Sequence, residues 1–501
     1  MRLLIAVAFV WSAAAQPVPA SRPKELQSLV DRIAVAPPEL GADILLRVIE
    51  SNAINDPAWK IELLDEAFQL ATRAKYPLPI TPAVERASNA DSDIGNIWLA
   101  LDQKLSGLTL QCRSVHAMLA TDKKKAVELF LDMPLPQVPG LSCKDANGYD
   151  PTDYYVTLKE VTERGFDDRE RREGKPFALL ERAIRSMNSP FQVYPALELI
   201  LDLKNLPRDQ FAALVVAYSS GLKQLYTEDR AFGSSIGYAL FQRLLRLAQI
   251  CRERDISPHG LIDAFRTYFV RQMSGPRCPE SVDPEGAGIV LTRIGEMVNT
   301  DLRPIADDVP EIKKDELKPA SIGEAASVIQ YGQTPQAKSL SKHVGELLYG
   351  NEQQRAIYKK EHPPDEIHGP DSLPMEVRRE PEWEAHAVAF IDELENWKKD
   401  QDVTEANYFH QVCMLYTQFI RAIPPGPMYD RVLHSHVLFL RGALIQKDSP
   451  PEWYVELNRL IHLYGASPAE LARIGEEIKK SGDDLMALYV DLSRFEKTRT
   501  H

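Results

Sequence analysis

Residues 449–497 read SPPEWYVELNRLIHLYGASPAELARIGEEIKKSGDDLMALYVDLSRFEK, and this stretch decides the fold class. Ser449 and Ser467 each precede a proline. A serine side chain can cap free N–H groups, and proline suits the first helical position because an N–H there would be unpaired anyway. Both serines are followed three residues later by a glutamate, the spacing of a capping box, and Gly465 and Gly482 mark helix ends. The stretch therefore predicts helices over 450–464, 468–480 and 483–497. Because the connections between them are short, we expect consecutive helices to pack antiparallel.

The same helical pattern recurs along most of the chain. Apolar residues three and four positions apart form a stripe on one face of a helix. Alternation at period two, which is typical of half-buried strands, is hard to find. One clear stripe consists of Phe211, Leu214, Val215, Tyr218 and Leu222. The sequence therefore predicts an all-α fold, an irregular α-helical solenoid of stacked antiparallel helical hairpins, with an α/α barrel as the alternative.

Two stretches interrupt the helical pattern and contain many prolines and acidic residues. They cover residues 303–318 and 361–381, and both compositions favour extended chain over packed structure. We expect the first to lie in a linker at 301–320. The predicted organisation is an N-terminal helical domain at 22–300 and a C-terminal helical domain at 321–501.

The first residues have the three-part order of a secretory signal peptide. Arg2 supplies a positive start, residues 3–11 are apolar, and residues 13–15 are three alanines of the kind that signal peptidase reads. The apolar run is too short for a membrane span, which needs roughly 20 apolar residues. We therefore expect residues 1–15 to be a signal peptide and the protein to be secreted or periplasmic, with no transmembrane anchor after cleavage.

Net charge limits the kinds of partner. The chain of 501 residues has 72 acidic and 59 basic residues, and its net charge is -13. Binding to nucleic acid needs clustered lysine and arginine to neutralise phosphates, and an anionic membrane surface attracts the same residues. The balance predicts no nucleic-acid partner and leaves a protein or a polysaccharide.

Five cysteines occur in the chain, and thiols close to one another tend to oxidise in exported proteins. The economical pairs along the sequence are Cys112 with Cys143 and Cys251 with Cys278, so we expect these two disulfides. Sequence alone does not decide connectivity. Cys413 lies in an apolar helical stretch and is interpreted as a buried thiol.

One irregular loop combines acidic and aromatic side chains. Calcium prefers oxygen ligands of this kind, but the glycine and glutamate positions of an EF-hand are not met, and Asn147-Gly148 is an ordinary turn dipeptide. We interpret the loop as solvated and as the first choice for a contact surface. Its candidate contact residues are Asp145, Tyr149, Asp150, Asp153, Tyr154 and Tyr155.

Short motifs for catalysis fail on their context. Residues 233–237 match the G-x-S-x-G of a hydrolase nucleophile elbow, but no strand precedes them, and a helix start explains the match. His434 and His436 lie two positions apart, so on one helix they point in different directions and do not share a metal ion. The sequence therefore predicts no catalytic residue, no metal ligand and no cofactor site.

Two functions from different classes follow. The helical-hairpin rhythm favours a non-enzymatic exported binding or scaffold module for another macromolecule. The alternative is an α/α-barrel hydrolase or lyase that acts on polysaccharide with a pair of carboxylates. Two carboxyl groups within about 5–10 Å in a deep cleft would favour the enzyme. A groove without clustered titratable groups would favour the binding module.

Overall fold

The computed structural model is predominantly helical, which confirms the all-α class. The predicted signal peptide at 1–15 lies outside the described residues. The structure describes residues 22–84, 91–225, 229–279, 287–306, 308–317, 320–321, 324, 326–361, 381–420, 423, 425–465 and 467–498.

The helices divide into two arms along the chain. The N-terminal arm contains α1 (Lys24–Asp31), α2 (Pro38–Glu50), α3 (Pro57–Ala71), α4 (Asp93–Leu101), α5 (Gly107–Thr121), α6 (Lys123–Asp132), α7 (Thr152–Arg164), α8 (Asp168–Arg172), α9 (Lys175–Arg185), α10 (Val193–Asp202), α11 (Arg208–Gln224), α12 (Asp229–Ser235), α13 (Tyr238–Glu253), α14 (His259–Met273) and α16 (Ala287–Met297). The C-terminal arm contains α17 (Pro335–Tyr349), α18 (Glu352–Glu361), α19 (Pro381–Asn396), α20 (Glu405–Ile420), α21 (Pro427–Gly442), α22 (Ile445–Asp448), α23 (Pro450–Tyr464), α24 (Pro468–Ser481) and α25 (Asp484–Lys497).

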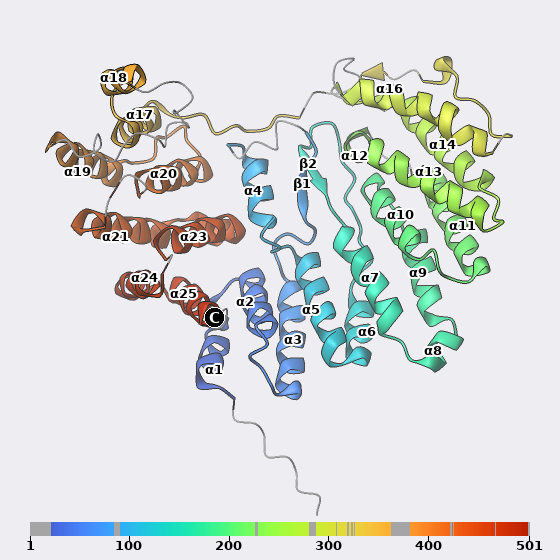
Figure 1. The fold of residues 1–501 in the computed structure, drawn as a ribbon, viewed down its shortest axis with the longest axis horizontal. Helices are drawn as coiled ribbons and strands as arrows, with labels where there is room; N and C mark the ends of the chain where they lie inside the picture. Colours follow the sequence, from blue (N-terminus) through green and yellow to red (C-terminus); the bar gives the residue numbers. More distant parts are fainter. Residues whose placement is uncertain are drawn as a thin grey trace, which may run out of the picture.

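Strands are very short in the part of the chain that the structure describes. Strand β1 (Ile80–Pro82) pairs antiparallel with β2 (Asn147–Tyr149), and β3 (Pro276–Arg277) pairs parallel with β4 (Ala320–Ser321). Both pairs lie along the same edge of the helical array (Figure 1). They join segments that are distant in the sequence and do not form a layer of their own.

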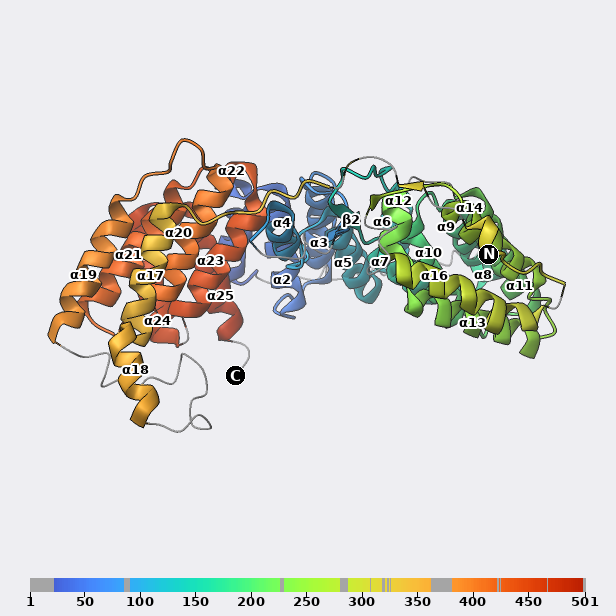
Figure 2. The ribbon, with the colours of Figure 1, turned by 90° about the horizontal axis from the view of Figure 1, so that it is seen from above.

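The two arms meet near the ends of the chain. Figures 1 and 2 show the helices in an elongated, curved array rather than a closed ring. From α1 to α16 the chain runs from the middle of the molecule to one end, then crosses back and builds α17 to α25 at the other end (Figure 1). The last helices return to the first ones, because α23 packs against α2 and α4, and α25 packs against α1 and α2. We call this junction the seam.

The seam combines a continuous apolar core with charged pairs. A single hydrophobic cluster contains buried residues of both arms. Around it, Arg47 of α2 donates to both carboxylate oxygens of Glu496 at 2.7 and 2.5 Å and to the hydroxyl of Tyr454 at 3.0 Å. Arg32 donates to Asp491 at 2.6 Å. The bidentate arrangement fixes the relative orientation of the two arms as well as their contact.

Of the two predicted capping boxes, the one at the start of α24 is confirmed. Ser467 and Glu470 form the expected capping box at the start of α24. Gly482 ends that helix with a φ of +72°, a conformation that suits glycine because it has no Cβ. Asp483 caps α25 through the N–H of Met486.

At α23 the predicted capping box is wrong. Ser449 makes no side-chain capping hydrogen bond. Its hydroxyl instead interacts with the side chains of Tyr76, across the seam, and Glu452. The hydroxyl of Ser449, which the local pattern predicted as a helix cap, therefore makes tertiary contacts instead.

The segment predicted as a linker at 301–320 packs over most of its described length. Leu302, Val309 and Ile312 are buried. Asn299 donates to the carbonyl of Ile312 at 2.9 Å and accepts from its N–H at 2.8 Å. These hydrogen bonds hold the segment on the end of the N-terminal arm. The division of the chain into domains at 22–300 and 321–501 stays a prediction.

The extended connection between the arms comes later, and we call residues 326–334 the strap. It crosses the start of α4, where Tyr331 donates its N–H to the carbonyl of Asp91 at 2.6 Å and Ile329 accepts from the N–H of Asp93 at 3.1 Å. Ser92 and Gln330 form an isolated antiparallel bridge there. The strap therefore brings a residue of its own, Tyr331, against the seam.

Candidate functional site

Two adjoining hollows lie where the C-terminal arm meets the strap and α4. The first, which we call the acidic pocket, has a cavity volume of about 20 Å³ and is lined by Asn96, Leu99, Tyr331, Ala406, Phe409, His410, Ile445, Glu452, Val455 and Glu456. The second, which we call the apolar groove, has a cavity volume of about 380 Å³ and is lined by Glu405, Tyr408, Phe409, Leu438, Phe439, Gly442, Ala443, Leu444 and Ile445. Phe409 and Ile445 belong to both linings, so these two side chains form the wall between the hollows.

The acidic pocket takes its two carboxylates from one face of α23. Glu452 and Glu456 are four residues apart, a spacing that places side chains one above the other with roughly 5–6 Å between Cβ atoms. Phe409 and His410 come from α20, and Tyr331 comes from the strap. The pocket therefore exists only when the two arms and the strap are assembled.

Glu456 is buried and balanced by a cation. Only 5% of the residue is exposed, and Arg459 donates to both of its carboxylate oxygens at 2.6 and 2.8 Å. Burial raises the pKa of Glu456, while Arg459 and His410 oppose that change. The thiol of Cys413 lies beside the same carboxylate and is buried, as the sequence predicted.

Glu452 is less well compensated. Burial raises the pKa of its carboxyl group, the neighbouring charge of Asp93 acts in the same direction, and Ser449 and Lys75 oppose them. Its Oε2 atom is buried and finds no hydrogen-bond partner among the described residues. Lys75 contributes only through the electric field. A buried acceptor in this state costs free energy that an incoming donor would recover.

Two other polar groups of the acidic pocket, His410 and Tyr331, lie close to carboxylates. His410 lies 3.2 Å from a carboxylate oxygen of Asp91 at the start of α4. Tyr331 is buried, and burial together with the carboxylates of Glu452 and Asp93 raises the pKa of its hydroxyl well above the ordinary value. The pocket therefore keeps Tyr331 as a neutral hydrogen-bonding group.

Aromatic packing holds the walls of the apolar groove. The rings of Phe409 and Phe439 stack with centroids 5.9 Å apart, and the hydroxyl of Tyr408 donates to the carbonyl of Trp397 at 2.8 Å. Leu438 and Leu444 are 42% and 59% exposed, which is high for leucine side chains. The groove thus combines rigid walls with exposed aliphatic edges.

Gly442 leaves the apolar groove open. It is the last residue of α21, and a Cβ built at this position meets no heavy atom within 4 Å. At the rim, Glu405 is paired with Lys399 at 3.1 Å. A larger side chain at position 442, in the lining of the groove, would therefore start from a Cβ that meets no clash.

The predicted contact loop around residues 145–155 is largely built into the N-terminal arm. Tyr154 and Tyr155 are each 2% exposed, so they do not form a contact surface. They lie in the first turn of α7, where Tyr154 stacks on Phe130 at 5.2 Å. The local composition does not show which helices pack over these tyrosines. The sequence therefore predicted that they are exposed.

The remaining residues of that loop have structural partners. Asp145 accepts hydrogen bonds from the N–H and hydroxyl of Ser142 at 2.7 and 2.9 Å, and Asp153 accepts from Thr109 at 2.6 Å. Tyr149 is half-buried in strand β2, and Asp150 is exposed. A contact role for Tyr149 and Asp150 stays a prediction.

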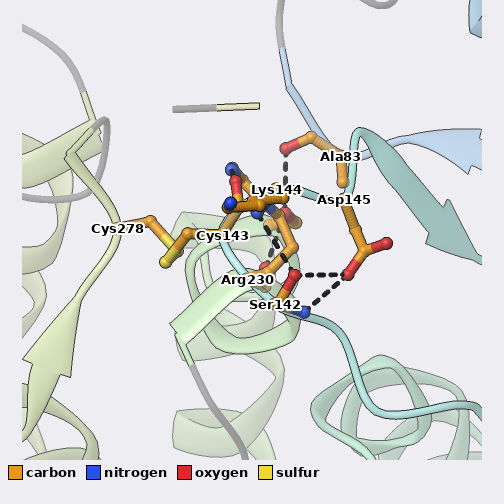
Figure 3. Close-up of a disulfide and its surroundings, with 8 residues drawn as sticks. Ala83, Ser142, Cys143, Lys144, Asp145, Arg230 and Cys278 are labelled. Atoms are coloured by element: carbon orange, nitrogen blue, oxygen red, sulfur yellow. Dashed lines mark hydrogen bonds between the residues drawn. A yellow bond between two sulfur atoms is a disulfide. The ribbon is translucent and has the colours of Figure 1, made fainter. Parts of the chain in front are cut away.

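The predicted disulfide pairing is wrong. Cys143 and Cys278 are joined to each other, with their Cα atoms 5.2 Å apart, while Cys112 and Cys251 are buried free thiols (Figure 3). Arg230 of α12 donates to the carbonyl of Cys143 at 2.6 Å. The bridge spans 135 residues, a contact that only the curvature of the array produces.

A signal for this pairing was present in the sequence. Cys112 and Cys251 both continue apolar helical stripes, which places them in the core. Cys143 and Cys278 lie outside the helices, in the irregular segments that follow α6 and α14. Two cysteines in loops are easier to bring together than one in a loop and one on a buried helix face.

The histidine and serine motifs make local contacts within the helical array. His434 lies 3.0 Å from Glu477, whereas His436 is fully buried and stacks on Tyr416 at a centroid distance of 4.7 Å. The hydroxyl of Ser235 donates to the carbonyl of Ala231 within α12. Among the described residues, no group of three or more histidine, cysteine, aspartate and glutamate side chains is placed to hold a metal ion.

No family model matches the sequence, and no curated protein is significantly similar to it. The molecule is thus defined as an all-α protein with one disulfide between distant loops. Within the described ranges, no helix has both the length and the apolar character needed to cross a membrane. The two hollows are the features of the described structure that bear on function.

Proposed function

We propose that this chain is an exported binding module that docks a segment of another protein in the apolar groove. The observation that carries the proposal is the pair of exposed leucines, Leu438 and Leu444, on walls already fixed by the stacked rings of Phe409 and Phe439. Exposed apolar surface in a concave, preorganised site is typical of protein-interaction grooves. A preformed site also avoids the entropy cost of ordering its walls on binding.

The lining favours a protein segment over a polysaccharide. Of the groove residues, only Glu405 and Tyr408 carry polar side-chain groups, and these groups already bind Lys399 and the carbonyl of Trp397. A sugar chain needs many hydrogen bonds, and the polar side chains of this groove already have partners. Apolar side chains of a partner need only the buried area.

Export is part of the same proposal. A disulfide persists in oxidising compartments, and the bridge between Cys143 and Cys278 would be unusual in a reducing cytosol. The order of residues 1–15 is typical of a signal peptide. A mass beginning near Gln16 in protein isolated from its native host would support export, whereas retention of Met1 would contradict it.

Site-specific photo-crosslinking in the native host tests the docking function. A photoreactive amino acid at position 438 or 444 should give one discrete adduct of higher mass. The same amino acid at Val216, which is 57% exposed on α11, serves as a control of matched exposure. The proposal fails if no adduct forms, or if position 216 yields the same adduct.

A second function is supported by a specific observation in the acidic pocket. Glu452 and Glu456 lie one helical turn apart with raised pKa values, the kind of pair that a glycoside hydrolase uses as acid and base. Against this function, Glu456 has both oxygens at Arg459. An enzyme should release reducing ends from polysaccharides and lose that activity in Glu452→Gln. Failure of the wild-type protein to release any would exclude it for the polysaccharides assayed.

A further inference from the structure

We infer that the acidic pocket binds a basic side chain of the partner segment, the same segment whose apolar side chains fill the groove. The inference rests on the proposed function and names the chemistry of the partner. The docked segment would carry a lysine or arginine beside its apolar residues. Docking of this segment requires no change in the positions of α20 to α23.

Geometry places the two hollows within reach of one segment. Phe409 and Ile445 line both, so the two hollows adjoin at these side chains. A segment seated between Leu438 and Leu444 therefore holds its neighbouring side chains over the wall that leads into the acidic pocket. An amphipathic helix, which presents residues three and four positions apart on one face, meets this requirement.

The unpaired carboxylate oxygens of the acidic pocket favour a basic side chain on the partner. Glu452 has a buried oxygen that lacks a hydrogen-bond partner in the described part of the chain, and one carboxylate oxygen of the nearby Asp93 is in the same state. Glu456 is already neutralised by Arg459. An ammonium or guanidinium group would donate to the unfilled oxygens and offset the negative charge. A carboxylate from the partner would be repelled.

Size is consistent with a side chain rather than a whole ligand. The acidic pocket has a cavity volume of about 20 Å³, room for about one water-sized group, whereas the groove has about 380 Å³. The narrow hollow would accept the end of one lysine or arginine, while the wider groove would accept larger apolar groups. The net charge of -13 acts in the same direction, because it attracts basic partners over a longer range.

Selection of random peptides displayed on phage, with the full-length protein as bait, tests the inference. We expect the enriched peptides to combine apolar residues at helical spacing with a lysine or arginine. The strongest peptide is then synthesised in two forms, one with its basic residue and one with norleucine in its place. Both are titrated into wild-type and variant protein by fluorescence anisotropy.

Two variants separate the groove from the pocket. Gly442→Leu fills the groove, and we expect it to weaken both peptides at least tenfold. Gly260→Leu is the matched control, because Gly260 is also exposed on a helix with no atom within 4 Å of its Cβ position, and it should bind both peptides normally. Glu452→Gln should weaken the basic peptide about tenfold and leave the norleucine peptide unchanged. That unchanged affinity also shows that the variant is folded.

Each outcome decides between the two proposals. If enriched peptides bind in the groove but carry no basic residue, and Glu452→Gln has no effect, the inference is wrong and the docking function stands. If Gly442→Leu binds the selected peptides as well as the wild-type protein does, or if no peptide is enriched, both are wrong. Selective loss of the basic peptide in Glu452→Gln supports both.

Discussion

The two arms of this protein are stabilised by different means. The N-terminal arm closes a long loop covalently through Cys143 and Cys278. The C-terminal arm has a single cysteine, Cys413, buried as a free thiol, and also holds a fully buried histidine, His436. One arm should therefore respond to reduction and the other to acid.

Loss of the disulfide should give the largest effect. The bridge spans 135 residues, and restriction of a loop of that size in the unfolded chain stabilises a protein by about 5 kcal/mol in the loop-entropy model. Replacement of both Cys143 and Cys278 by serine should lower the free energy of unfolding by that amount, as measured by urea denaturation. Hydrogen exchange should accelerate in α12 to α14 and not in α24. Equal acceleration in both regions would contradict the contrast between the arms.

Acid should loosen the C-terminal arm through His436. Burial lowers the pKa of His436 to about 3 from an ordinary value of 6.5. Because the folded state holds this histidine neutral, its contribution is present above pH 6.5 and is lost as the pH falls toward 3. Each pH unit in that window costs at most about 1.4 kcal/mol, hence about 3 kcal/mol by pH 4.

The variant His436→Phe should remove this acid sensitivity. Phenylalanine keeps the ring stack on Tyr416 and takes no proton, and both ring nitrogens of His436 lack partners among the described residues. Urea denaturation at pH 7 and pH 4 measures the difference, with His434→Gln, at an exposed ring, as the control. A stability loss in acid that is the same in His436→Phe and wild type would show that other groups cause it.

Breaking the seam should have a smaller effect. Arg47→Ala removes two hydrogen bonds to Glu496 and one to Tyr454 at a partly exposed site, for a loss of about 2 kcal/mol. Arg431→Ala is the control, since Arg431 pairs with Asp392 and Glu395 inside one arm and should cost under about 1 kcal/mol. Small-angle scattering should show a larger radius of gyration for Arg47→Ala only. An unchanged radius would mean that the apolar core alone holds the arms together.

The smallest effect should be a gain in stability. Burial raises the pKa of Glu452, so the folded state favours its protonated form, and its ionisation costs stability as the pH rises above the ordinary carboxyl range. Glu452→Gln removes that cost and should raise the free energy of unfolding at pH 7 by about 0.5–1 kcal/mol, with little change at pH 4. Thermal denaturation at both pH values measures the difference. Destabilisation at pH 7 would show that the carboxylate makes a contact that the amide does not replace.

Local chemistry determined the helices. The stripe that begins at Phe211, the capping box of Ser467 and the glycine at 482 act within one or two turns of chain, so the sequence alone predicted the all-α class and the boundaries of the C-terminal helices. The burial of Cys413 and the separation of His434 from His436 follow from the same periodicity.

Tertiary structure alone decided the diversion of Ser449 to Tyr76 and the burial of Tyr154 and Tyr155. It also decided the candidate site, since Glu452, Phe409 and Tyr331 come from different segments. Leu438 and Leu444 lie in an apolar stretch of the sequence, yet they are exposed in the folded chain whereas Val437 and Leu440 are buried. The physical reason is that helical periodicity places a side chain on a face of its helix. What covers that face depends on which helices the curvature of the array brings together.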